Sequence, residues 1–207
     1  MKSSRVARLE PYLMPGGAEW SKLPREEVAL IATPLAMQPT EYVRKSWADK
    51  AYGQTNPLRV AAVHDGAMLA VLMSWVGVAP AGKDFPDAIA MAMPVRGNPP
   101  LALMGTPEAP IHVLRWQANE KAPLSILATG IGSSRPGPEV ARQVQAWTEG
   151  GSWNVVLARA LGGSGEVAPL AVGSTTRIGF AVWRGDNDER AGIKAFSIDW
   201  AELALDA

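Results

Sequence analysis

The sequence contains no cysteine, and this absence excludes several kinds of metal and redox site at once. Without thiols the chain forms no disulfide, no thiolate metal site, no iron–sulfur cluster and no covalent haem link through a C-x-x-C-H motif. Histidine is scarce as well, because His64 and His112 are the only two. A zinc or non-haem iron site built from several imidazoles is therefore disfavoured. The metal ligands that remain are methionine, lysine, carboxylates and a single histidine.

An excess of charge of either sign is also lacking. Lysine plus arginine and aspartate plus glutamate number 20 each, which gives a net charge of zero. The chain therefore has no excess of positive charge that would attract nucleic acid or an anionic membrane. The sequence has no run of about 20 apolar residues that would span a membrane, and its first ten residues lack the apolar core of a secretory signal. A neutral surface suits docking onto another protein, although many monomeric enzymes share it.

Length and composition indicate a single domain over residues 1–207. Hydrophobic residues make up 47% of the chain and charged residues 19%, a balance typical of folded proteins, and this length is sufficient to bury a core. Residues 1–25 are polar and interrupted by proline and glycine. They predict an extended N-terminal arm that lies on the domain.

Short apolar segments separated by glycine and proline predict a mainly β fold. The clearest hairpin pairs residues 58–64 with 67–75 around Asp65 and Gly66. Residues 176–183 alternate apolar and small or polar side chains, as a half-buried antiparallel strand does. Further strands are expected over 27–33, 87–93, 111–116, 124–129, 153–161 and 193–200.

Two segments carry helical signals. Residues 42–47 predict one helical turn, and residues 138–147 predict a helix because Val140, Val144 and Trp147 fall on one helical face. The chain shows no alternation of strands with helices of the kind that builds a parallel sheet. The pattern favours an antiparallel β-sandwich with one or two short helices.

Met104 and Lys194 are the candidate metal ligands. Met104 lies between Pro100 and Gly105, where a turn can direct its side chain, although most methionines fill gaps in a core. Lys194 lies in a strand-like apolar segment, where a lysine is usually a solvated surface residue. A lysine buried in an apolar pocket loses proton affinity, and its neutral amine can then bind iron. The residues alone leave both interpretations open.

His112 is the runner-up candidate, as an alternative to Lys194 beside Met104. A lone histidine at the start of a strand is usually a hydrogen-bonded surface or core residue, but histidine with methionine is a common pair of haem ligands. No Ser-His-Asp arrangement, carboxylate pair or phosphate-binding loop can be assigned. The sequence therefore predicts no catalytic residue.

Seven segments, in order along nearly the whole chain, carry a family resemblance: Thr33–Leu35, Leu58–Gly66, Met93–Gly97, Leu103–Gly105, Trp153–Leu157, Phe180–Trp183 and Glu189–Lys194. Through them the chain resembles the haem b-binding γ subunits of type II dimethyl-sulfoxide-reductase-family molybdoenzymes, most closely that of ethylbenzene dehydrogenase. The resemblance implies a β-sandwich that holds haem b without a covalent link. Its axial ligands would be Met104 and Lys194.

The resemblance also implies partners and a role. The chain would be one subunit of a heterotrimer, beside a molybdopterin α subunit and an iron–sulfur β subunit. It would relay single electrons between the β subunit and an external carrier, with no catalytic turnover of its own. Family members are typically periplasmic; since no signal is seen, the cytoplasm is the alternative location.

A different class of function stays open beside this one. The eight tryptophans can form the platform of a cofactor-free β-sandwich binding module of the carbohydrate type, if their rings are exposed. Such a protein would be colourless, and sugars would change its tryptophan fluorescence.

Overall fold

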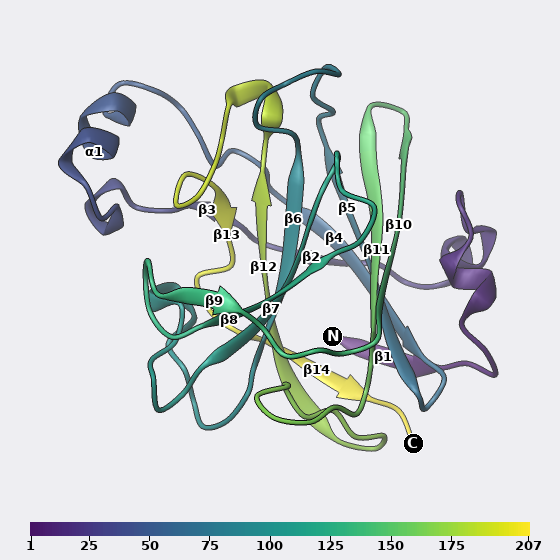
Figure 1. The fold of residues 1–207 in the computed structure, drawn as a ribbon. Coiled ribbons are helices and arrows are strands. Elements are labelled where there is room, and N and C mark those ends of the chain that lie inside the picture. Colours follow the sequence, from purple (N-terminus) through teal and green to yellow (C-terminus); the bar gives the residue numbers. More distant parts are fainter.

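The fold is a β-sandwich of two layers with one short α-helix, seen in a computed structural model that describes residues 1–207 (Figure 1). The strands are β1 (Lys2–Arg5), β2 (Glu26–Val28), β3 (Ile31–Ala32), β4 (Leu58–His64), β5 (Met68–Val76), β6 (Ala88–Pro94), β7 (Ile111–Gln117), β8 (Leu124–Ala128), β9 (Ser134–Pro136), β10 (Arg142–Glu149), β11 (Ser152–Ala160), β12 (Thr175–Trp183), β13 (Ala195–Phe196) and β14 (Ala201–Leu205). The helix is α1 (Glu41–Trp47), and 3-10 turns cover Glu10–Leu13, Ala18–Lys22, Leu35–Met37, Leu101–Leu103 and Gly185–Asn187. None of the helices is both long and apolar enough to cross a membrane.

The two layers share strand β12. Its first half pairs with β14 in the layer ordered β10-β11-β5-β4-β1-β14, and its second half pairs with β6 in the layer β12-β6-β7-β8-β9. The pairs are antiparallel except those of β1, which is parallel to both β4 and β14. The predicted β-sandwich is therefore confirmed, with one parallel strand inserted in an otherwise antiparallel layer.

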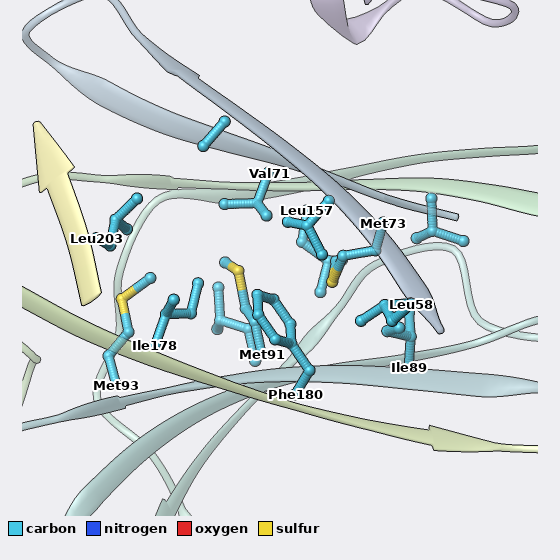
Figure 2. Packing of buried hydrophobic residues seen from close by; sticks show 14 of the residues in the cluster. Leu58, Val71, Met73, Ile89, Met91, Met93, Leu157, Ile178, Phe180 and Leu203 are labelled. Carbon is cyan, nitrogen blue, oxygen red and sulfur yellow. The ribbon is translucent and has the colours of Figure 1, made fainter. Parts of the chain in front are cut away.

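The main core lies between the layers. Met91 and Phe180 of one layer face Met73 and Leu157 of the other (Figure 2). The side chains at 178, 180 and 182 of β12 all point into this core, as the alternation predicted. Each strand of the second layer consequently has an inner face toward the core and an outer face away from it.

The predicted helical turn at 42–47 is confirmed as α1. Thr40 caps it, since its hydroxyl accepts a hydrogen bond from the Val43 amide at 3.3 Å. The predicted helix at 138–147 is wrong: residues 142–149 form strand β10, which pairs along its length with β11. Val144 packs against the main core and Trp147 against the opposite face of the layer, as alternation along a strand requires.

Three further expectations need correction. Residues 1–25 are not simply an extended arm, because β1 lies within the first layer, between β4 and β14, while residues 9–23 pack on that layer's outer face around the buried Trp20. The last strand is not continuous over 193–200. Only residues 195–196 pair with the second half of β12, and the chain then shifts to pair β14 with the first half. Likewise 27–33 divides into β2 and β3, which pair with different strands, β4 and β13.

Candidate functional site

The outer face of the second layer carries a flat patch of small side chains. Ala90 and Ala92 on β6 pair with Ala181 and Gly179 on β12, and Ala92 also pairs with Val113 on β7. We call these five residues the alanine shelf. Paired residues on neighbouring strands present their side chains to the same face, so the shelf is a continuous patch of small apolar residues, which Leu101 and neighbouring side chains cover. A Cβ at residue 179 would come within 2.5 Å of the Leu101 side chain, so Leu101 packs directly on the glycine there.

Met104 lies beside this shelf. It follows the 3-10 turn at 101–103 and has a left-handed backbone with φ of 61°, a conformation that non-glycine residues seldom adopt. Hydrogen bonds hold the turn, from the Met104 amide to the Leu101 carbonyl at 2.9 Å and from the Gly105 amide to the Pro100 carbonyl at 3.1 Å. Its half-buried side chain packs against the cluster that contains the alanine shelf. The predicted turn is therefore confirmed.

Lys194 approaches the same cluster from the other end of the sequence. It lies in a bend just before β13, and its carbonyl accepts a hydrogen bond from the Thr33 amide at 3.0 Å. Its Nζ is 5.4 Å from the centre of the Trp183 ring, and Trp183 packs against the shelf cluster. The amine forms neither a hydrogen bond nor an ion pair. Burial lowers the pKa of Lys194 to about 8.

Two tryptophans that the sequence did not single out hold this arrangement together. The indole Nε1 of Trp183 donates to the Ala191 carbonyl at 3.0 Å, which ties the end of β12 to the segment that carries Lys194. The indole of Trp200 donates to the Pro99 carbonyl at 2.8 Å, close to the turn that carries Met104. Both rings pack against the shelf cluster. A sequence signal for the shelf exists in the alternate alanines at 88, 90 and 92.

His112 lies on the other side of the sheet. It shares the inner face of β7 with Leu114, whereas Val113 belongs to the shelf. Its Nε2 is 3.0 Å from the Ser125 hydroxyl and its Nδ1 is 3.5 Å from Nη1 of Arg159. Burial, with the nearby Arg159 and Arg142, lowers the pKa of His112 to about 4. The structure thus packs Met104 on the shelf cluster and places the Lys194 amine near Trp183 at the edge of that cluster, while His112 lies apart with both ring nitrogens engaged.

Other kinds of site find little support. The structure contains no group of three or more histidine, aspartate or glutamate side chains that could hold a metal ion. One surface hollow of about 400 Å³ lies elsewhere, and its lining of polar residues such as Arg25, Ser74 and Asn154 includes neither Met104 nor Lys194. The eight tryptophans are buried or half-buried, so the exposed indole platform of the carbohydrate-binding alternative is absent.

Two solved structures with a similar fold are those of carbohydrate-binding proteins. A family 9 carbohydrate-binding module from Caldicellulosiruptor kristjanssonii, in complex with glucose, superposes with a TM-score of 0.54 at 12% identity and covers 100% of this chain and 95% of its own. A putative carbohydrate-binding protein from Bacteroides uniformis gives a TM-score of 0.53 at 10% identity, covering 100% and 98%. At such low identity the likeness concerns the fold alone.

Sequence relatives are more informative. The chlorate reductase subunit gamma of Ideonella dechloratans is 32% identical over 196 residues, which cover 91% of this chain and 78% of that protein. A putative respiratory nitrate reductase heme subunit of Haloferax mediterranei is 27% identical over 194 residues, covering 90% and 66%. No family model matches the sequence. With 32% identity over most of both proteins, the chain belongs to the γ subunits of the type II dimethyl-sulfoxide-reductase-family molybdoenzymes.

Proposed function

We propose that this chain binds haem b between Met104 and Lys194 and serves as an electron-transfer subunit. The observation that carries the proposal is the amine of Lys194, which is half-buried beside the ring of Trp183 and has no hydrogen-bonding or charged partner. Such a group is costly to bury unless something binds it. The names of the two relatives, a reductase γ subunit and a reductase heme subunit, agree with this role.

The residues at the cluster fit haem b chemically. A lysine binds iron only as the neutral amine, and an ordinary lysine has a pKa of about 10.4. With its pKa lowered to about 8, Lys194 gives up its proton near neutral pH at a far smaller cost. The sulfur of Met104 is the second neutral donor, and the small residues of the alanine shelf, with Leu101, Trp183 and Trp200 packed on them, make the surroundings apolar.

Bound haem supplies one-electron redox chemistry between the ferrous and ferric states. Met104 and Lys194 would be the two protein ligands of the iron, so no ligand position would remain for oxygen or a substrate. A thioether ligand and an apolar surrounding both favour the ferrous state, so the reduction potential should be relatively high. Met104 and Lys194 therefore favour electron relay over bond-making chemistry.

The proposed partners follow from membership of the family. Single electrons would pass between an iron–sulfur β subunit and an external carrier, while a molybdopterin α subunit performs catalysis. The periplasm is the proposed location. This chain alone should show no catalytic turnover.

Reconstitution with haem b tests the proposal. The wild-type protein should give the spectrum of six-coordinate low-spin haem, and its reduced form should not bind carbon monoxide. Met104→Ala and Lys194→Ala should each lose this spectrum or lose haem altogether, and any haem kept by Met104→Ala should bind carbon monoxide. His112→Ala and Met68→Ala, a half-buried methionine on the other layer, are the controls and should keep the wild-type spectrum. Unchanged spectra in both ligand variants, or a protein that binds no haem, would refute the proposal.

A further inference from the structure

Arg159 is a buried cation without a counter-ion. Only 1% of the residue is exposed, it forms no salt bridge, and burial alone accounts for the lowering of its pKa to about 10. Its guanidinium is held by backbone carbonyls instead, through Nε to Ala160 at 2.8 Å and Nη2 to Ala168 at 2.9 Å and Leu161 at 3.3 Å. With a pKa of about 10, Arg159 stays positively charged at neutral pH.

The hydrogen bonds around Arg159 have one consistent direction. An arginine can only donate, so Nη1 donates to Nδ1 of His112. The histidine is then neutral and carries its proton on Nε2, from which it donates to the Ser125 hydroxyl at 3.0 Å. Ser125 in turn donates to the Pro138 carbonyl at 2.7 Å. Neither side chain in this chain of bonds neutralises the charge of Arg159.

The charge lies directly behind the alanine shelf. Nη1 of Arg159 is 3.5 Å from Nδ1 of His112 on β7 and 4.0 Å from the sulfur of Met93 on β6. The neighbours of these two residues along their strands, Val113 and Ala92, belong to the shelf on the opposite face. A single layer of sheet therefore separates the guanidinium from the surface at which we place the haem.

We propose that the positive charge of Arg159 raises the reduction potential of the haem, an inference that rests on the proposed function. A positive charge in a protein interior favours the redox state that carries one more electron, which is ferrous haem. At a separation of about 10 Å and an effective dielectric constant of about 20, the interaction changes the ferrous-to-ferric ratio at a fixed ambient potential on the order of tenfold. Tenfold corresponds to about 59 mV for a one-electron couple.

A matched pair of variants at His112 provides the test. In His112→Asp a carboxylate replaces the Nδ1 acceptor and neutralises Arg159, whereas in His112→Asn an uncharged amide oxygen takes the same place. Potentiometric titration of the haem-loaded proteins at pH 8 should give a potential about 59 mV lower for the aspartate variant than for the asparagine variant. Because the pair is buried, high salt should leave the difference in place.

Arg159 itself gives the second comparison. Arg159→Lys keeps the charge and should stay near the wild-type potential, and Arg159→Met removes the charge and should lower it. If Arg159→Met does not fold, the difference in reduction potential between His112→Asp and His112→Asn alone tests the role of Arg159. Equal potentials for His112→Asp and His112→Asn in proteins with the full haem spectrum would overturn the role of Arg159 and leave the proposed function standing. A wild-type protein without a Soret band would instead remove the proposed function.

Discussion

Lys194 should make the stability of the haem-free protein depend on pH in the alkaline range. Burial lowers its pKa from 10.5 to about 8, so the unfolded chain holds this proton more tightly than the folded protein does. The destabilisation is complete below pH 8 and disappears as the pH rises from 8 to 10.5. Over this range the wild-type protein should gain on the order of 3 kcal/mol in unfolding free energy relative to Lys194→Met. Urea unfolding at pH 7, 8.5 and 10 measures the difference.

The comparison with Lys194→Met removes the contribution of the other titrating groups, which both proteins share. Methionine has a similar length and no charge, so it keeps the contact with Trp183. Curves that stay parallel from pH 7 to 10 would show that the amine is hydrated in the folded protein. In that case the principal support for an iron-binding lysine would be lost.

The sequence was enough to name Met104, Lys194 and His112 as candidate ligands, but it did not reveal the surroundings of their side chains. Met104 could be assigned to a turn because proline and glycine flank it, and the turn is confirmed. The isolation of the Lys194 amine depends on Trp183 and on the strands behind it, which no local pattern reveals. The position of His112 depends on which face of β7 it occupies, and a shift of one residue would have reversed it.

At the scale of elements, period-two alternation was a reliable guide and helical spacing was not. The hairpin of β4 and β5 was predicted from its Asp65-Gly66 turn, and the strand β12 was predicted from its alternation. Residues 140, 144 and 147 suggest a helix, yet residues 144 and 147 lie in β10, whose pairing with β11 decides the structure. Short edge strands with mixed polarity lack a clear period, so tertiary pairing overrides the local signal.

Strand β1 should be essential to the sheet although it begins at residue 2. Ser3 is fully buried and pairs with Ala62 on one side and Leu205 on the other. Ser3→Pro removes a backbone donor from a central strand and should cost on the order of 3 kcal/mol or more. Ser3→Ala should be neutral or slightly stabilising, because the Ser3 hydroxyl has no hydrogen-bond partner. The urea unfolding midpoints of the two variants test this prediction. Equal midpoints would mean that β1 contributes little to the stability of the fold.

At the scale of the whole molecule, the second layer presents a different surface on each face of its strands. Its inner face carries Met91 and Phe180 into the main core, and its outer face carries the alanine shelf. The sequence indicated the first surface through its large apolar side chains. The only sign of the second surface in the sequence is the alternate alanines at 88, 90 and 92, because small residues acquire a role only when segments distant in sequence, here those carrying Met104 and Lys194, pack around them.

The shelf can be tested without touching either proposed ligand. Ala181 is half-buried at its margin, and Ala181→Leu adds bulk on the side where the haem would lie. Haem affinity should fall by about tenfold or more, since overpacking typically costs ~1–3 kcal/mol, while the urea midpoint of the haem-free protein should change little. Ala204→Leu, at a half-buried alanine of β14 outside the shelf cluster, is the control and should bind haem normally. A wild-type Soret titration in Ala181→Leu would place the haem elsewhere, because a flat ligand cannot lie against the shelf once a leucine projects from it.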